Sequence, residues 1–276
     1  MKKSFLYFLL FFLLYHPNNV VALEKIPVAV TILPQVYFLE RIGGDYTDVK
    51  VMIPKGMNPE TYEPTPQHLI SLSKARIYVK IGRDNFPAEK KFLKIITNKK
   101  VMPETVSMAA NSSRQGQDPH IWVSTSAVKI LSHDICGALA LVDPAHKVYY
   151  ERNLALFLQD IAKTDREIRT ILAGKEGKTF MVYHPAWGYF AAEYGLKQLA
   201  IEEEGKPANL FHMRKIVDLA KEKGIDVIFV QKGFDLRSAR SVAAEIGARI
   251  IETDPLEKDW LANLKNFAIL LQESVK

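Results

Sequence analysis

The stretch PAHKVYYERNLALFLQDIAKTDREIRTILA, residues 144–173, decides the architecture of this chain. Its apolar side chains recur at helical spacing, Asp143-Pro144 is a typical signal for a helix start, and Gly174 is a typical stop. At 1.5 Å per residue, such a helix would be ~45 Å long. We expect a rigid linking helix over residues 144–174 that joins two lobes. The alternative is a long helix packed on one continuous sheet.

Short runs rich in β-branched residues alternate with helix-length amphipathic segments on both sides of this helix. The runs cover residues 28–33, 48–53, 76–81, 180–183, 198–201, 226–230 and 249–251. This alternation predicts an α/β fold in which each lobe is a mainly parallel sheet flanked by helices. We therefore expect an N-terminal lobe over residues 23–143 and a C-terminal lobe over residues 175–276.

The first residues are typical of a secretory signal peptide. Lys2 and Lys3 precede an apolar run over residues 5–15, and small residues lead to a predicted cleavage after Ala22. The run is shorter than the ~20 residues that span a bilayer, although a single anchor helix is the alternative. No cysteine follows it, which argues against a lipid anchor, and no second long apolar segment is evident. We expect a soluble periplasmic protein after cleavage of residues 1–22.

Composition and motif searches exclude several classes of protein. The 276 residues carry 37 Lys plus Arg and 31 Asp plus Glu, a net charge of +6 that falls to +4 without the two lysines of the signal peptide. This balance gives no support for a nucleic-acid partner. The only cysteine, Cys136, lies in an apolar stretch, so we expect a buried thiol and no internal disulfide. The chain lacks Gly-x-Gly-x-x-Gly and Gly-x-Ser-x-Gly, so nucleotide binding and serine hydrolysis lose support.

Four side chains that can bind metals lie in loops, three of them just beyond predicted strands. They are Glu60, His120, His184 and Asp254. In open parallel sheets, ligands bind beyond the carboxyl ends of the strands, where such loops converge. Two of the four precede the predicted linking helix and two follow it, so they could meet in a cleft between lobes. Imidazole and carboxylate ligands suit a divalent first-row metal, although each residue alone could be a surface or capping residue.

Several strings resemble motifs of the zinc- and manganese-binding solute receptors of ABC transporters. They are GMNPETYEPTP at 56–66, DPHIW at 118–122, YHPAWGYF at 183–190, IEEEGK at 201–206 and DPL at 254–256. The resemblance implies a two-lobed receptor, not an enzyme, that holds one divalent ion between its lobes and delivers it to a permease in the inner membrane. It also implies that Glu60 and His120 bind the ion from the N-terminal lobe, and His184 and Asp254 from the C-terminal lobe. A monomer is expected.

Two departures from the family pattern bear on the metal. Glu60 stands where the zinc receptors usually carry histidine, which gives two nitrogen ligands and two carboxylates. We expect zinc as the bound ion. Manganese or ferrous iron is the alternative, because this harder set favours those ions more than a three-histidine set does. Glu60 could also have lost ligation, and His68 could substitute for it. The segment 111–117 is short and has no histidine, so no accessory metal-gathering loop is expected.

Two other functional classes remain open. A metallohydrolase would need an open coordination position for water, which loss of Glu60 from the site would provide. An adhesin with an incidental metal site is not separable by sequence. The aromatic residues Trp122, Trp187 and Tyr189 are expected to wall the cleft, and Glu63 to hold its own turn through hydrogen bonds.

Overall fold

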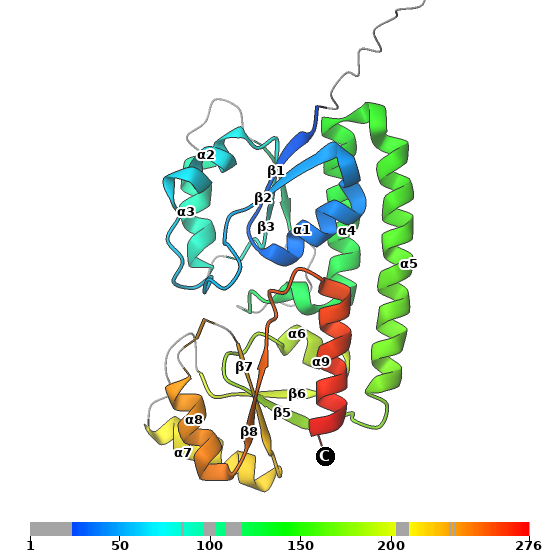
Figure 1. The fold of residues 1–276 in the computed structure, drawn as a ribbon. Coiled ribbons are helices and arrows are strands. Elements are labelled where there is room, and N and C mark those ends of the chain that lie inside the picture. The colour runs from blue at the N-terminus through cyan, green and yellow to red at the C-terminus, as the bar shows by residue number, and fades with distance from the viewer. Residues whose placement is uncertain are drawn as a thin grey trace, which may run out of the picture.

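The computed structural model describes residues 24–83, 86–96, 103–108, 118–202, 210–231, 233–234 and 236–275. The predicted signal peptide, 1–22, and the short segment 111–117 lie outside the described residues. The remaining elements form two lobes, one above the other in Figure 1, with α5 running beside both.

The N-terminal lobe is a parallel sheet with the strand order β2-β1-β3-β4 within the described residues. Its elements are β1 (Ile26–Val30), α1 (Leu33–Gly43), β2 (Thr47–Val51), α2 (Pro66–Lys74), β3 (Ile77–Lys80), α3 (Pro87–Ile96), β4 (Glu104–Ser107) and α4 (Thr125–Val142). The strand β4 was not predicted, because it is a short edge strand with mostly exposed side chains and little apolar signal. The strand predicted at 28–33 ends at Val30, since α1 begins at Leu33 with Pro34 in its first turn.

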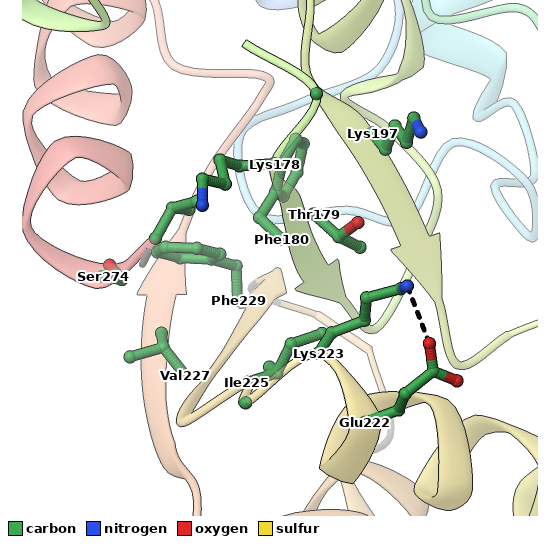
Figure 2. A pocket seen from close by; sticks show the side chains of 13 residues that line it. Lys178, Thr179, Phe180, Lys197, Glu222, Lys223, Ile225, Val227, Phe229 and Ser274 are labelled. Carbon is green, nitrogen blue, oxygen red and sulfur yellow. Dashed lines mark hydrogen bonds and ion pairs between the residues drawn. The ribbon is translucent and has the colours of Figure 1, made fainter. Parts of the chain in front are cut away.

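The C-terminal lobe repeats this arrangement with the order β6-β5-β7-β8, again parallel. Its elements are β5 (Thr179–Val182), α6 (Gly188–Glu193), β6 (Lys197–Ala200), α7 (Leu210–Glu222), β7 (Val227–Gln231), α8 (Arg237–Ile246), β8 (Arg249–Thr253) and α9 (Trp260–Ser274). All five residues of β7 are buried, as expected for a central parallel strand. A cavity of about 310 Å³ lies at the amino ends of β5, β6 and β7 (Figure 2).

The linking helix is confirmed but is shorter than predicted at both ends. A 3₁₀ turn, Pro144–His146, precedes α5, which spans Lys147–Ile171. The Asp143 carboxylate forms hydrogen bonds with His146 Nδ1 and Tyr150 Oη, each at 2.7 Å, and these contacts hold the turn. The alternative of one continuous sheet is wrong, because the strands form two separate sheets.

One buried apolar core runs from the first sheet to the second. Trp260 at the start of α9 packs edge-on against Phe38 of α1, with ring centroids 5.1 Å apart, and also contacts Phe157 of α5. The Trp260 indole donates a hydrogen bond to the carbonyl of Trp122 at 2.6 Å. The shared core therefore ties the C-terminal lobe to α1 and α5 and opposes wide hinge motion between the lobes.

Helix α4 corrects the expectation that no second long apolar segment follows the signal peptide. Among the described residues, it is the one helix long and apolar enough to cross a membrane by length and composition. It packs against α5 and α1, and Val128, Leu131 and Ile135 are fully buried in the core. Cys136 on the same helix is buried, as predicted. The apolar character of α4 is thus explained by its place in the core.

Candidate metal centre

Loops beyond the carboxyl ends of the strands bring the predicted side chains toward one another. His184 follows β5, whose neighbours β6 and β7 lie on opposite sides of it, and Glu202 follows β6. Ligands bind at this kind of position in open parallel sheets. From the N-terminal lobe, Glu60 lies in the loop between β2 and α2, and His120 immediately precedes the 3₁₀ turn Ile121–Val123 that leads into α4.

Two buried histidines from different lobes form the centre of the site. His120 Nε2 lies 3.0 Å from His184 Nε2, and both imidazoles are more than nine-tenths buried. Each ring engages a carboxylate through its other nitrogen: Asp118 Oδ1 lies 2.7 Å from His120 Nδ1, and Glu202 Oε2 lies 2.5 Å from His184 Nδ1. A carboxylate at Nδ1 indicates that this nitrogen carries the proton in each neutral ring.

The consequence is that two lone pairs face each other across the cleft. With protons on both Nδ1 atoms, neither Nε2 of His120 or His184 has a hydrogen to donate. Two acceptors at 3.0 Å repel unless a proton or a cation lies between them. Zinc bonds to imidazole nitrogens at ~2.0–2.1 Å, which in a tetrahedral site separates two such nitrogens by ~3.3 Å. The observed spacing is therefore close to that of a shared metal ion.

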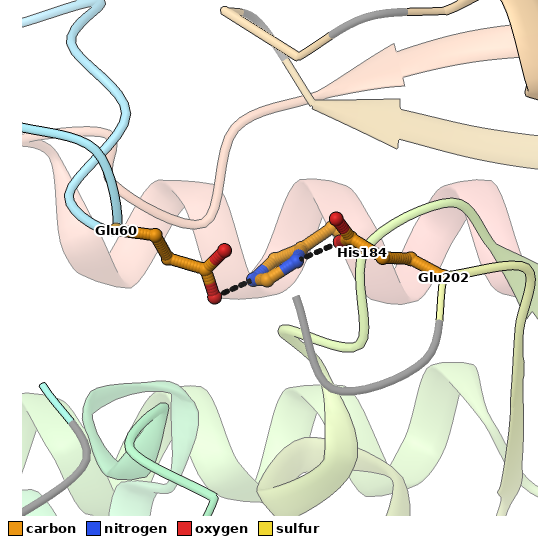
Figure 3. Close-up of side chains that lie close together, drawn as sticks. All are labelled: Glu60, His184 and Glu202. Carbon is orange, nitrogen blue, oxygen red and sulfur yellow. Dashed lines mark hydrogen bonds and ion pairs between the residues drawn. The ribbon is translucent and has the colours of Figure 1, made fainter. Parts of the chain in front are cut away.

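Glu60 joins this pair from the N-terminal lobe. Its Oε1 lies 3.7 Å from His184 Nε2, and Figure 3 shows the carboxylate pointing toward the ring from the side opposite Glu202. Single ligand atoms of Glu60, His184 and Glu202 all lie within 4.8 Å of one another, the spacing of a metal site. The Asn58 side chain accepts a hydrogen bond from the Glu60 backbone N–H at 2.9 Å and holds the local turn. The side chain of Glu60 is 30% exposed, so an ion could enter from its side.

His68 does not join the cluster. Its Nδ1 lies 2.5 Å from the Tyr62 hydroxyl and 3.0 Å from Thr65 Oγ1, so it secures the end of the loop that carries Glu60. Glu63 does not hold its own turn as predicted, because its carboxylate pairs with Lys91 of α3. The exposed Glu63 side chain reaches the neighbouring helix more readily than the backbone of its loop.

Asp254 lies beside the cluster and not within it. Its carboxylate accepts a hydrogen bond from the Leu256 backbone N–H at 2.9 Å, in the turn after β8. Asp254 lines a small cavity with Ile32 and Lys55, whereas Glu60 lines the adjacent cavity that contains the histidines. Leu256 contributes to both cavities. Of the four predicted ligands, Glu60, His120 and His184 line one cavity, and Asp254 lines the neighbouring one.

Burial governs the ionisation of the site. Loss of hydration lowers the pKa of His120 below its usual value, against the opposing effect of the hydrogen bond with Asp118. Burial would raise the pKa of the Asp118 carboxyl, but its hydrogen bonds with the His120 side chain and backbone hold that pKa below its usual value. His120 is thus favoured in the neutral form that a metal requires, and Asp118 in the charged form.

Aromatic rings enclose the pair of histidines. Phe234 stacks on His184 with ring centroids 4.6 Å apart, and Trp122 packs edge-on against His120 at 5.1 Å. Trp122 therefore walls the cleft, as predicted. Trp187 is different: it stacks on Phe267 of α9 at 3.7 Å and belongs to the core. The prediction that Trp187 walls the cleft is wrong, because its ring stacks on α9 and is buried in the core.

Tyr189 lies where the two lobes meet, and its hydroxyl accepts a hydrogen bond at 2.8 Å from Arg83 of the N-terminal lobe. The bond joins the loop after β3 to helix α6 across the boundary between the lobes. Tyr189 therefore lies at the boundary between the lobes, and its expected place in the wall of the cleft stays a prediction.

Two carboxylates of the site were not predicted as functional. Asp118 lies two residues before His120, and Glu202 follows β6 as directly as His184 follows β5. The same position relative to a strand end could have identified Glu202. Gly188 supports this arrangement, because a Cβ atom there would lie 2.7 Å from Asp118 Oδ2. Glycine at the start of α6 therefore leaves room for the carboxylate that orients His120.

Comparison with known proteins identifies relatives of this chain that are named for zinc uptake and iron binding. The high-affinity zinc uptake system protein ZnuA of Bacillus subtilis is 27% identical over 256 residues, covering 85% of this chain and 79% of that protein. The iron-binding protein YfeA of Yersinia pestis is 26% identical over 249 residues, covering 85% and 78%. A crystal structure of ZnuA matches with a TM-score of 0.85 at 36% identity and covers 91% of this chain and 99% of that one.

The family model of the periplasmic component A of zinc-uptake complexes matches residues 28–274, which include both lobes and every residue of the candidate site. With this match, the shared fold and the facing histidines, the chain belongs to the family of periplasmic zinc-uptake component A proteins.

Proposed function

We propose that this protein captures one zinc ion in the cleft between its lobes and delivers it to an ABC permease in the inner membrane. The proposed ligands are Glu60, His120, His184 and Asp254. The function rests on family membership, and the choice of residues on the facing Nε2 atoms of His120 and His184. Two buried acceptors at 3.0 Å, each oriented by a carboxylate at its Nδ1 atom, are a donor pair suited to bind a cation.

The carboxylates have different roles in this proposal. Asp118 and Glu202 orient the histidines through Nδ1 and raise their basicity. Glu60 supplies the third ligand from the exposed side of the cleft. Asp254 supplies the fourth when its side chain exchanges the Leu256 amide for the metal ion. Four protein ligands would leave no position for an activated water, so we propose a receptor without enzymatic activity.

Manganese or ferrous iron is the second candidate cargo. The observation that favours it is Glu60, since a carboxylate in place of a third imidazole makes the donor set harder. An iron-binding protein is also among the relatives of this chain. We further propose that the mature protein acts in the periplasm as a monomer. We propose no lipid anchor, because no cysteine directly follows the apolar run at residues 5–15.

The decisive experiment is a competitive titration of zinc, manganese and ferrous iron against the mature protein and three variants. Glu60→Ala should weaken binding of the preferred ion, and Glu60→His should shift the preference toward zinc. Glu63→Ala is the matched control, because Glu63 lies in the same loop and pairs only with Lys91 among the described contacts. Equal affinities of wild type and Glu60→Ala would remove Glu60 from the ligand set.

Absence of metal from the purified wild type and from Glu60→Ala, together with metal in Glu60→His, would overturn the receptor proposal for this chain. An adhesin with an incidental site would then be the better account. Hydrolysis of an ester or amide by the metal-loaded wild type, lost in His184→Ala, would favour the metallohydrolase instead.

A further inference from the structure

One buried amide beside the metal centre is not explained by the proposed ligand set. Gln231, the last residue of β7, is only 8% exposed, and its side-chain oxygen has no hydrogen-bond partner among the described residues. A buried polar group without a partner costs stability and is rare in folded proteins. Gln231 lines the same cavity as Glu60, His120 and His184. A captured ion in this cavity would be a partner for the amide.

The strand register brings Gln231 close to His184. The parallel strands β5 and β7 pair Val182 with Phe229, and His184 and Gln231 each follow this pair by two residues. Side chains alternate across a strand, so Gln231 lies on the same face of β7 as Phe229. Val182 and Phe229 both belong to the core that the lobes share. Register and alternation therefore carry Gln231 and His184 to the same end of the sheet and into one cavity.

The chain beyond Gln231 is held against the other lobe. Phe234 stacks on His184 with ring centroids 4.6 Å apart, and Gly233 has a φ of 85°. A Cβ atom at Gly233 would lie 3.0 Å from the carbonyl oxygen of Gly56, in the loop between β2 and α2. Glycine permits both the positive φ and the close approach of the two loops. Gln231 thus precedes a segment that packs on both lobes at the site.

The cavity has room for one ion. Its volume is about 10 Å³, the space of a single water-sized sphere, so each group that lines it lies close to its occupant. Gln231 adds a neutral amide oxygen to the carboxylate of Glu60 and the two imidazoles, whereas Asp254 lines the neighbouring cavity. Zinc is usually satisfied by four ligands, whereas manganese takes more and prefers carboxylate, carbonyl and water oxygens. An additional carbonyl donor therefore favours manganese more than zinc.

We infer, on the basis of the metal capture proposed above, that Gln231 binds the captured ion through its side-chain oxygen and raises the affinity for manganese relative to zinc. The amide joins the donors of Glu60, His120 and His184 from the central part of the C-terminal sheet. Its uncompensated burial in the metal-free protein is offset when the ion binds.

Two substitutions separate the oxygen donor from the volume that the side chain fills. Gln231→Met keeps the approximate length but removes the amide oxygen, and Gln231→Glu keeps a side-chain oxygen. In competitive titrations of the mature protein, Gln231→Met should bind manganese about 10- to 100-fold more weakly, the effect of losing a contact between a polar group and a charge. Zinc affinity should fall less, and Gln231→Glu should bind manganese at least as tightly as wild type.

Gln159→Met, at an exposed position of α5 outside the cavity, is the control and should bind both ions as wild type does. Equal manganese affinities of wild type and Gln231→Met would overturn the role of Gln231. Equal losses of manganese and zinc affinity would overturn its role in selectivity. Absence of metal from the wild type would instead overturn the proposed capture itself.

Two further measurements distinguish a ligand from a structural side chain. The melting temperature of metal-free Gln231→Met should equal or exceed that of wild type, because the substitution removes a buried polar group without a partner. A lower melting temperature would overturn the inference in favour of a structural role. With Co²⁺ as the probe, visible absorption should be stronger in Gln231→Met, since loss of a donor lowers the coordination number. Identical Co²⁺ spectra would exclude Gln231 from the ligand set.

Discussion

At the scale of single residues, the site depends on which nitrogen of each histidine faces a carboxylate. The carboxylates of Asp118 and Glu202 form hydrogen bonds with the Nδ1 atoms of His120 and His184. Both Nε2 atoms are therefore left to bind a metal ion. Neutralising one of these carboxylates would change the orientation and basicity of a ligand without removing the ligand itself. Substitution of either carboxylate should therefore lower the metal affinity less than substitution of a histidine ligand does.

We predict that Glu202→Gln lowers metal affinity by about 10- to 100-fold, the usual effect of losing a carboxylate partner of a metal-binding histidine. The amide keeps the shape of the buried side chain but can present its NH₂ group to His184 Nδ1. The measurement is competitive metal titration. Glu245→Gln on the surface of α8 is the control and should bind as wild type does. A change smaller than twofold in Glu202→Gln would contradict the prediction.

The pH dependence of the metal-free protein follows from His120. Burial lowers the pKa of His120 in the folded state below the ~6.5 of an unfolded chain, so the unfolded state binds more protons between these values. The contribution of His120 to stability is therefore present above pH ~6.5 and is lost as pH falls through the lower folded pKa. Urea midpoints of the metal-free protein should fall from pH 7.5 to pH 5, and the fall should be smaller in His120→Gln. Parallel pH profiles for the two proteins would refute this assignment.

At the scale of elements, the contact between the 3₁₀ turn Ile121–Val123 and α9 joins the lobes beside the site. Trp122 donates its indole N–H to the Pro255 carbonyl at 2.8 Å, and Trp260 donates to the Trp122 carbonyl at 2.6 Å. Both rings are almost fully buried. The two bonds fix the turn that follows His120 against the segment between β8 and α9.

We predict that Trp260→Phe destabilises the protein by about 2–4 kcal/mol. It leaves the buried Trp122 carbonyl without its donor and opens space against Phe38 and Phe157. Urea unfolding at pH 7.5 in the presence of a chelator measures the change without a contribution from bound metal. A loss below about 0.5 kcal/mol would show that the contact between the lobes is not carried by this side chain.

A second contact between elements bears on release of the ion. Arg83, in the loop after β3, donates to the Tyr189 hydroxyl of α6 at 2.8 Å. Tyr189→Phe removes this link between the lobes and should speed metal release several-fold, with little effect on stability. Stopped-flow exchange into a chelator measures the rate. Tyr37→Phe is the matched control, because Tyr37 accepts a hydrogen bond from Arg41 within the N-terminal region; an equal increase in both variants would contradict a role of the link.

At the scale of the whole molecule, a metal ion that joins Glu60 and His120 of one lobe to His184 of the other should stabilise both lobes together. At a free metal concentration one hundred times the dissociation constant, the gain in unfolding free energy is ~2.7 kcal/mol. For a chain of this size, that corresponds to a rise in melting temperature of about 5–11 °C. Differential scanning calorimetry should show one transition that shifts as a unit. A shift of only part of the transition would indicate an ion held by one lobe alone.

The rigidity expected of the molecule comes from its shared core more than from α5 alone. Helix α5 runs beside both lobes (Figure 1), and Arg41 of α1 bonds to Asp160 of α5 at 2.5 Å. Further along α5, Asp165 accepts a hydrogen bond at 3.1 Å from the hydroxyl of Tyr194, which follows α6 in the C-terminal lobe. Since both lobes are bonded to the same helix, we expect metal binding to alter loops and side chains around the cleft more than the relative orientation of the lobes.

Much of this arrangement could be predicted from local sequence. The α/β class was predicted from alternating strand and helix patterns, and the linking helix from apolar residues at helical spacing. Both predictions were possible because such periodicity depends only on residues that are near one another in the sequence. Glu60, His120 and His184 could be selected because each follows a strand or precedes a helix start, which places it in a loop. The edge strand β4 could not be predicted, since its pairing with β3 and not its own composition stabilises it.

The sequence by itself determined which loops carry metal-binding side chains and, through its motifs, the family to which the chain belongs. Only the tertiary structure decided that Asp118 and Glu202 contact the Nδ1 atoms of the histidines, that Asp254 lines a neighbouring cavity, and that Trp187 lies in the core. The physical reason is the range of the interactions. Secondary structure follows from contacts between near neighbours, whereas the meeting of His120 and His184 depends on the packing of a core that both lobes share.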